Sequence, residues 1–462
     1  MGKKIAIGGG QGFWGDSPDA AIHMIENADI QYMGLDYLAE LTLSIMARQK
    51  IKDPTKGYAP DFVTRILKSA GRTAYEKKIR MITDAGGMNV DGCVEAIRSW
   101  AKEEGLEGYK IGYVTGDDIK DKIPELIKNG WDFPSMDTAG SNDNSVTFKD
   151  IQDKIYNCNA YIGHEAIRDS IANGADVVVT GRAADSALFL ASLAYEFGWK
   201  ENDWNNLARG IMAGHLLECG GQGAGGNFMY DWRGVPDMEH LGFPIAELTE
   251  DSFEITKAPN CGGLISEQSV KEQFLYEVLD PANYLTPDVN VDISRATVTQ
   301  VGDNRVSIGG IQGKEKPDTI KLCVGYHKGW KTVSMLSFAW PDAYEKAKYC
   351  SEIIMKKMKE RGMKADDVHI SFIGLDSLHL GVADKSPESL ARLNECVMRI
   401  AVFSEDKNEC AKIIPEISPL QLNGPQGASF FGGRAHVQEV MALYPTVVPR
   451  EVLDVQSHII RV

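Results

Sequence analysis

Acidic side chains stand at the ends of three predicted strands. Asp36 ends one apolar run, Asp84 follows the strand-like run 78–83, and Asp185 begins a helix-like pattern soon after the run 175–180. In a parallel sheet the carboxyl ends of the strands share one edge, so these side chains can converge. Convergent carboxylates suit proton transfer beside a carboxylate or thioester carbonyl. We therefore predict that Asp36, Asp84 and Asp185 are catalytic.

One arginine belongs to the same predicted edge. Arg182 lies just before Asp185, and its guanidinium group matches the geometry of a substrate carboxylate. Asp16, Glu40 and Asn89 also lie near strand ends, and we predict that Asp16, Asn89 and Arg182 bind substrate. The alternative for each acid taken singly is a helix cap, the commonest use of Asp at such positions. Five acids, an asparagine and an arginine exceed what capping needs, which favours a site.

His215 and Cys219 form a second candidate pair. They are four residues apart, so on one helix they share a face. A thiolate and an imidazole could act as nucleophile and base, or supply two metal ligands. The alternative is packing, because Leu216 and Leu217 stand between them. No further His/Cys pair has ligand spacing, so we predict catalytic roles for His215 and Cys219 and no metal.

A glycine-rich turn follows the first strand-like run. Gly10, Gly12 and Gly15 have the G-x-G-x-x-G spacing, which predicts an anion or substrate site at a helix N-terminus. The alternative is a tight turn that any α/β protein needs here. A dinucleotide is the weaker prediction, because Trp14 is bulky and Asp16 carries a negative charge at the phosphate position.

Two further loops could contact a ligand. Asn227 follows the glycine run 220–226, which is typical of a loop that binds an anion or packs closely against another backbone. Arg434 follows two glycines and could bind a phosphate or carboxylate, although a surface turn explains it equally. We predict that Asn227 and Arg434 contact substrate.

The elements that must position these residues change character along the chain. Residues 1–205 alternate buried-strand and helix patterns, which predicts a doubly wound, mainly parallel sheet covered on both faces. Residues 206–330 contain alternating β-type runs and predict a β-rich middle domain. Residues 331–462 predict an α+β domain, in which we expect a helix over Pro387–Ala401. The predicted fold class is α/β.

Composition excludes several classes of function. The 462 residues carry a formal net charge of −16, which argues against nucleic acid or an anionic membrane as partner. The eight cysteines are scattered, and no signal peptide or long apolar run is visible, so we expect a cytoplasmic protein with reduced thiols.

Several motifs, in order along the chain, resemble the acyclic terpene utilisation (AtuA) family. They cover about residues 5–300 and include Gly12-Phe-Trp-Gly-Asp16, Gly34-Leu-Asp-Tyr-Leu-Ala-Glu40, Asp84-Ala-Gly-Gly-Met-Asn89, Thr180-Gly-Arg-Ala-Ala-Asp185, Ala213-Gly-His-Leu-Leu-Glu-Cys-Gly220, Gly225-Gly-Asn-Phe228, Gly242-Phe-Pro-Ile-Ala-Glu247 and Gly262-Gly-Leu264.

The resemblance implies a setting and a partner. The family is named for the degradation of geraniol-like terpenes, which runs through branched acyl-CoA intermediates. Longer members carry a small C-terminal ferredoxin-like domain, which in some relatives resembles a separate short protein. We therefore expect a homo-oligomer with a small ferredoxin-like companion subunit.

The function that combines these features is a lyase, a hydratase or dehydratase. Its predicted substrate is a branched hydroxy- or unsaturated carboxylic acid or the CoA thioester of that acid. The cofactor is unknown, and CoA is expected only as part of the substrate. Two alternatives stay open: a nicotinamide-dependent oxidoreductase with its ribose on Asp36, and a non-catalytic subunit that binds an acyl-CoA.

Overall fold

The computed structural model describes residues 2–136 and 146–462, and the chain forms two compact units. The first unit contains residues 1–325 together with 443–462, and the second contains 326–442. Among the described residues, no helix is long and apolar enough to cross a membrane. The chain is an α/β protein, as predicted.

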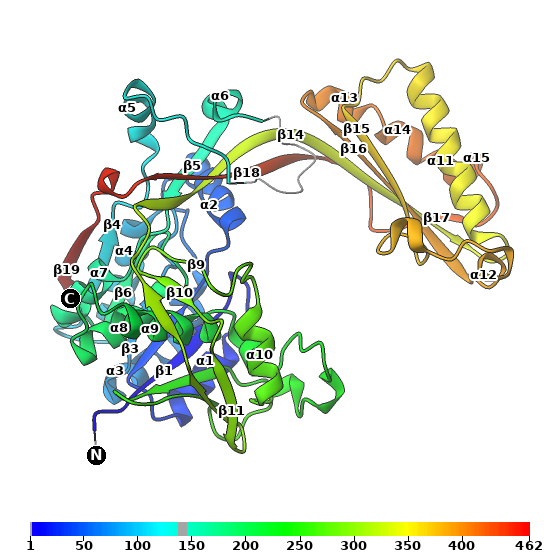
Figure 1. The fold of residues 1–462 in the computed structure, drawn as a ribbon. Coiled ribbons are helices and arrows are strands. Elements are labelled where there is room, and N and C mark those ends of the chain that lie inside the picture. Colours follow the sequence, from blue (N-terminus) through cyan, green and yellow to red (C-terminus); the bar gives the residue numbers. More distant parts are fainter. Residues whose placement is uncertain (1, 137–145) are drawn as a thin grey trace. The chain divides into compact units, whose positions relative to one another are not determined.

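Five parallel strands form the centre of the first unit (Figure 1). They are ordered β1-β2-β3-β6-β4 in a ten-stranded sheet. Their bounds are β1 Ile5–Gln11, β2 Tyr32–Leu35, β3 Arg80–Thr83, β6 Val177–Val179 and β4 Lys110–Thr115. Because they are parallel, their carboxyl ends lie at one edge of the sheet, where α/β proteins bind ligands.

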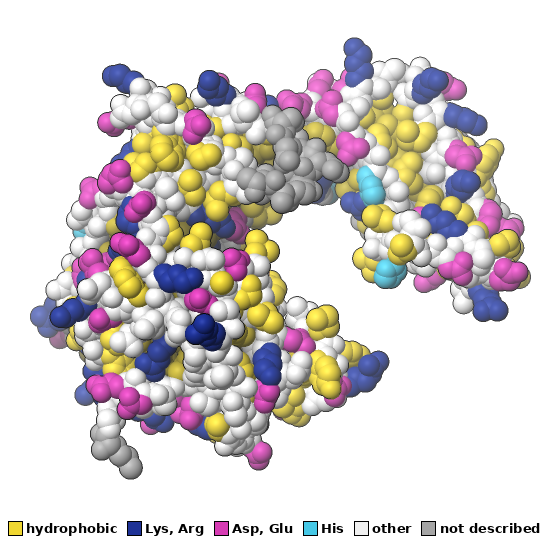
Figure 2. Space-filling view, in the orientation of Figure 1, with side chains coloured by type: hydrophobic (Ala, Val, Ile, Leu, Met, Phe, Trp, Pro, Cys, Tyr) yellow, Lys and Arg dark blue, Asp and Glu magenta, His cyan; other side chains and the backbone are white. Residues whose placement is uncertain are grey.

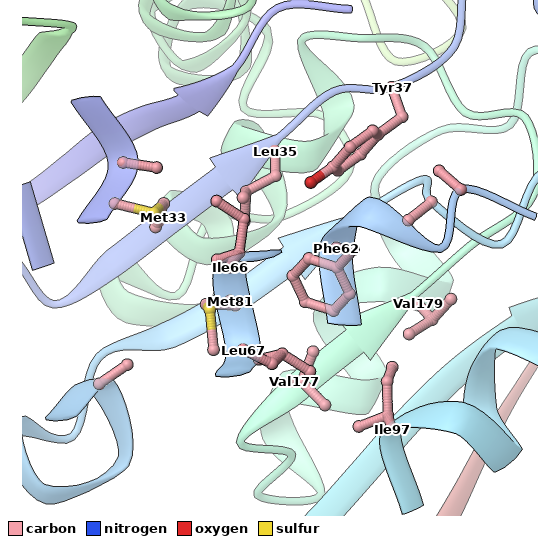
Figure 3. Packing of buried hydrophobic residues seen from close by; sticks show 14 of the residues in the cluster. Met33, Leu35, Tyr37, Phe62, Ile66, Leu67, Met81, Ile97, Val177 and Val179 are labelled. Carbon is pink, nitrogen blue, oxygen red and sulfur yellow. The ribbon is translucent and has the colours of Figure 1, made fainter. Parts of the chain in front are cut away.

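Helices cover both faces of this centre. One layer joins α1 (Asp19–Asn27), the π-type helix η1 (Phe62–Gly71) and α4 (Val90–Glu103). The other joins α7 (Glu165–Ala172) and α8 (Ala187–Phe197), which pack on each other and on the strands. Figure 3 shows part of the first layer, where apolar side chains of η1 and α4 lie against those of β2, β3 and β6. The strands are buried on both faces, which explains their continuous apolar runs.

Antiparallel strands extend the sheet on both sides. On the β1 side lie β7 (Pro244–Leu248), β8 (Phe253–Lys257), β12 (Arg305–Gly309) and β11 (Thr297–Gly302). On the β4 side lies β19 (Gln456–Arg461). The middle part of the chain is therefore rich in strands as expected, but these strands belong to the sheet of the first part. The predicted boundary at 205 does not separate two units.

The other elements of the first unit surround this sheet. Near the carboxyl edge, β9, β10 and β13 form a small three-stranded sheet. The remaining bounds are α2 Glu40–Lys52, α3 Arg72–Lys77, α5 Ile123–Lys128, α6 Phe148–Ile151, β5 Ile155–Ala160, α9 Trp204–Leu217, α10 Glu267–Leu275, β9 Tyr284–Leu285, β10 Asn290–Asp292 and β13 Gln312–Lys314.

The second unit has a sheet and core of its own. Its strands run in the order β15-β16-β14-β17, and α11 packs on β16. The bounds are β14 Thr319–Ala339, α11 Ala343–Glu360, β15 Asp367–Ile373, α12 Pro387–Ala391, β16 Glu395–Ser404, α13 Lys407–Ala411, α14 Ile414–Ile417, α15 Leu420–Asn423, β17 Ala428–Phe430 and β18 Val437–Pro449. β14 and β18 continue into the first unit.

One predicted helix is wrong in this unit. The sequence predicted a helix over Pro387–Ala401, but the helix α12 ends at Ala391 and the strand β16 begins at Glu395. In β16 the side chains of Met398, Ile400 and Val402 are buried in alternation, the period of a strand.

Candidate functional site

Two buried carboxyl groups meet beyond the ends of β2 and β3. The backbone N–H of Leu38 donates to Oδ1 of Asp36 (2.9 Å), and that of Tyr37 donates to Oδ1 of Asp84 (2.7 Å). The turn after β2 thus holds its own acid and the acid of the neighbouring strand. Asp36 also lies within hydrogen-bond reach of Asp84. The sequence predicted that both acids lie at this edge of the sheet. The parallel pairing of β2 with β3 brings their two carboxyl groups together.

Burial raises the pKa values of both acids. It raises the pKa of Asp84 to about 6, against the charge of Arg182. Burial, with the charges of Asp185 and Asp84, raises the pKa of Asp36 well above its ordinary value. Oδ2 of Asp84 has no hydrogen-bond partner among the described residues. Because the two carboxyl groups lie within hydrogen-bond reach of each other, they titrate as one system.

Asp185 joins the same cluster through Arg182. The Nη2 of Arg182 donates to Oδ1 of Asp185 (2.5 Å). Burial raises the pKa of Asp185 to about 7, opposed by Arg182 and helped by the charge of Glu218. A third of the Asp185 side chain is still accessible, and it lines a cavity. Asp185 can therefore exchange a proton with a ligand in that cavity.

Arg182 organises the cluster and is fully buried. Its Nη1 donates to the carbonyl of Leu38, and its guanidinium lies 4.2 Å from the centre of the Tyr161 ring. Its backbone N–H donates to Asp117 (2.8 Å). Both terminal nitrogens are thus occupied within the protein, one of them by Asp185. The structure places Arg182 at the site as predicted, and among the described residues its Nε has no hydrogen-bond partner.

A second cation lies beside Tyr161. The Tyr161 hydroxyl donates to Oε1 of Glu40 (2.5 Å), and the Nζ of Lys321 is 3.2 Å from the same oxygen. Burial raises the pKa of Glu40, but the Tyr161 hydrogen bond and the charges of Lys321 and Arg182 outweigh it and hold the value at about 2. Sequence reasoning missed Tyr161 and Lys321, because neither lies in a motif and each comes from a separate segment.

These groups line one cavity of about 480 Å³ in the first unit, called the central cavity below. Its charged lining comes from Asp36, Glu40, Arg182, Asp185, Glu218, Glu277 and Lys321. Its apolar lining includes Leu38, Leu285 and Ile320. The volume lies within the usual range of small-molecule sites, about 300–1,000 Å³. The central cavity combines two acids whose pKa values are raised, Asp36 and Asp185, with Glu40, whose pKa is lowered, and with two cations.

The predicted His215–Cys219 pair is arranged differently from the expectation. The helix α9 ends at Leu217, so Cys219 lies beyond its last turn. Nδ1 of His215 is 3.0 Å from Oε1 of Glu218, and His215 is buried. Cys219 lines the central cavity, but burial raises the pKa of its thiol. A neutral thiol is a poor nucleophile, so the chemistry that this pair can offer is limited to orienting Glu218.

The glycine turn is filled by its own acid. The N–H of Gly12 donates to Oδ2 of Asp16 (3.1 Å), and that of Ser17 donates to Oδ1 (2.7 Å). A Cβ on Gly12 would lie 2.8 Å from the carbonyl carbon of Cys219. A Cβ on Gly10 would lie 2.7 Å from the sulfur of Met33, while Gly15 has φ +112°. The geometry therefore gives close packing and turn formation as roles for these glycines.

The last three predicted contacts lie in different places. Asn89 caps α4 and donates to the carbonyls of residues 54 and 56, so its amide is engaged in the fold. Asn227 donates to Oε1 of Gln222 (3.2 Å) and lines a neighbouring cavity. Arg434 is exposed in the second unit.

One group of described residues has the spacing of metal ligands. Ligand atoms of His164, Glu165 and Asp288 lie within 4.8 Å of one another. Nδ1 of His164 is 2.7 Å from Asp288, and Lys316 lies 2.9 Å from Glu165. These ion pairs already balance the charges, as in a structural network.

The sequence matches one family model over almost its whole length. Residues 5–459 match the model described as acyclic terpene utilisation family protein AtuA. No curated protein and no solved structure matches the sequence.

Proposed function

This chain belongs to the acyclic terpene utilisation (AtuA) family, and we propose that it is a hydro-lyase of a catabolic pathway. Its substrate in this proposal is a branched hydroxy- or unsaturated carboxylic acid, free or as a CoA thioester. One observation carries the proposal. Buried acids with raised pKa values, Asp36 and Asp185, line the central cavity beside the cations Arg182 and Lys321.

The raised pKa values suggest an acid and a base. When the environments of two titratable groups give them different pKa values, one group can act as the acid and the other as the base. Asp185, with a pKa of about 7, is partly ionised at neutral pH and serves as the base that removes the proton from C2 of the hydroxy acid. Asp36, whose pKa is raised well above its ordinary value by burial and by the charges of Asp185 and Asp84, serves as the acid.

In the dehydration direction, the electron pair of the C2–H bond forms the C2=C3 double bond. The C3–O bond breaks, and Asp36 protonates the departing hydroxyl so that water leaves. Lys321 stabilises the negative charge that develops on the carbonyl oxygens. The proton that Asp185 removed from C2 then returns to Asp36 through the central cavity, which both acids line, and this restores the starting protonation.

Proton exchange in heavy water tests this proposal. The purified protein is incubated in D2O with branched 2-enoates and 3-hydroxy acids, free and as thioesters, and deuterium at C2 is followed by NMR. We expect exchange with at least one pair, and a loss of about 10²–10⁴-fold for Asp185→Asn. Asp176→Asn is the matched control, because Asp176 also has a pKa raised by burial but binds the Lys110 backbone outside the cavity. Exchange by no substrate, or equal losses in both variants, would contradict the proposal.

The alternatives carry less support. A nicotinamide would place its pyrophosphate where Asp16 already accepts the N–H groups of Gly12 and Ser17. A non-catalytic acyl-CoA subunit gives no reason for buried acids that line a cavity. The companion subunit and the homo-oligomer stay predictions.

A further inference from the structure

The charges around the central cavity limit the charge of its ligand. Arg182 and Lys321 are its cationic lining residues, against five acidic ones. Arg182 is almost fully buried, its side chain 2% exposed, and it is paired with Asp185. Lys321 is paired with Glu40, but 39% of its side chain stays accessible. Lys321 is thus the more accessible cation for a ligand.

A larger cavity of about 900 Å³, called the outer cavity, adjoins the central one. Gly12, Cys219 and Tyr276 line both. A ligand too long for the central cavity would extend into this space. The acids that line the outer cavity are Asp16, Asp19, Asp237 and Glu239, and no Lys or Arg is among the described residues of its lining.

A third cavity, of about 690 Å³, has no Lys or Arg in its described lining that could bind phosphates. It adjoins the outer cavity at Gln222, Asn227 and Met238. Glu272 is the charged residue of its described lining. The N–H groups of the glycine turn, a natural phosphate cradle, are occupied by Asp16.

These observations bear on the substrate, and the conclusion rests on the hydro-lyase function proposed above. We propose that the substrate is a free branched carboxylic acid, bound through its carboxylate to Lys321, and that the CoA thioester is not a substrate. CoA carries a pyrophosphate and a 3′-phosphate, which proteins hold with Arg, Lys and free backbone N–H groups. Along the path out of the central cavity these phosphates would meet four acids.

Raised pKa values lower the negative charge that a singly charged ligand meets. Burial raises the pKa of Asp36 well above its ordinary value and those of Asp84 and Asp185 to about 6 and about 7. Glu40 is paired with Lys321 and Glu218 with His215, which leaves Glu277 as the further acid of the described lining. A single carboxylate therefore adds less negative charge than a CoA thioester would, and its branched chain lies against apolar lining residues such as Leu38 and Ile320.

Three forms of one acyl group separate the possibilities. A series of branched 2-enoates, beginning with 3-methylbut-2-enoate, is compared as free acid, as CoA thioester and as N-acetylcysteamine thioester, which is a thioester without phosphates. Calorimetry measures binding, and deuterium incorporation measures exchange. We expect the free acid to bind at least tenfold more tightly than the CoA thioester.

The outcomes for the substrate and for the reaction are distinct. A CoA thioester that binds or exchanges as well as the acid overturns the free-acid inference and leaves the hydro-lyase proposal standing. A free acid that binds without exchanging deuterium supports the inference and contradicts the hydro-lyase. Absence of binding by all three forms throughout the series overturns the inference.

A charge-removing variant tests the contact with the carboxylate. Lys321→Met should raise the KM for the free acid at least tenfold and also lower kcat, because Lys321 both binds the carboxylate and stabilises the charge that develops on it. Lys316→Met is the matched control, because Lys316 pairs with Glu165 outside the central cavity. If the KM for the free acid is unchanged in Lys321→Met, the assigned contact is wrong.

Discussion

Two acids at the same sheet edge show how differently one residue type can be used. Asp16, in the turn after β1, receives two backbone N–H groups from its own loop. Asp36, after the adjacent β2, receives the N–H of Leu38 and faces two other acids. Burial raises the pKa of Asp16, and its two backbone donors oppose that rise. Burial and two neighbouring acids together raise the pKa of Asp36 well above its ordinary value. Position at a strand end therefore does not by itself set the protonation of an acid, because the burial and the neighbours of each acid differ.

The acids on the surface of the molecule differ from the buried acids of the central cavity. The chain carries a net charge of −16, and on the face drawn in Figure 2 the Lys and Arg side chains are scattered among Asp and Glu. Most of these exposed acids stay ionised at neutral pH because water solvates them. The buried acids of the central cavity lack that solvation, which separates them in chemistry from the rest.

The largest expected effect separates the two acids directly. Asp36→Asn should lower the rate of deuterium exchange by about 10²–10⁴-fold, because the amide cannot supply the proton. Asp16→Asn keeps one of the two accepting oxygens and places an NH2 group at the other. Because Asp16 has no part in the proposed proton transfer, the rate should stay within about threefold. The rates are measured under saturating substrate. Equal losses in both variants would show that the glycine turn also takes part in the reaction.

The next effect concerns packing of the glycine turn. Gly12→Ala places a Cβ 2.8 Å from the Cys219 backbone, which cannot move cheaply. We expect a loss of about 1–3 kcal/mol in the free energy of unfolding, typical of overpacking. Urea titration measures it. Gly381→Ala is the control, because its Cβ would meet no atom within 4 Å. If Gly12→Ala does not change the free energy of unfolding, the close-packing role of Gly12 is wrong. The ligand-binding interpretation of the turn would then be favoured again.

A smaller effect is the dependence of stability on pH. Asp84 has a folded pKa of about 6, against about 3.9 in an unfolded chain. Between these values the folded state holds a proton that the unfolded state has released, so stability falls as pH rises. Asp185 extends the fall to about pH 7. Calorimetric Tm values from about pH 4 to 7 should therefore decrease.

The Asp84→Asn variant checks the origin of that slope. Its Tm should depend less on pH than that of the wild type, because the titrating carboxyl is gone. Asp53→Asn serves as the control, since Asp53 lies in a loop with 42% of its side chain exposed and its pKa is lowered by the hydrogen bonds of Thr55. A slope that persists in Asp84→Asn would assign it to other groups.

The smallest expected signal comes from NAD. With Asp16 in the anion position, calorimetric titration of NAD into the protein should give no measurable heat of binding. An affinity in the micromolar range would show that the turn after β1 binds a ligand, as the acids after β2 and β3 are proposed to do. That result would favour the oxidoreductase.

Sequence patterns were sufficient for part of the fold and part of the candidate site. Alternating buried strands and helices predicted the parallel sheet, and the strand ends predicted where Asp36, Asp84 and Asp185 lie. In the second unit, periodicity failed over Pro387–Ala401, where β16 replaces a helix. A short apolar run does not by itself distinguish a strand from a helix, because tertiary pairing makes that choice.

The sequence by itself determined which acids reach the sheet edge, because a parallel strand delivers the residue after it to one edge wherever the strand lies. Only the tertiary structure decided what each acid can do. The pairing of β2 with β3 placed Tyr37 N–H on Asp84, and distant segments brought Tyr161 and Lys321 to Glu40. The protonation of a carboxyl group depends on its burial and on every charge and donor around it, and these neighbours come from segments far apart in the chain.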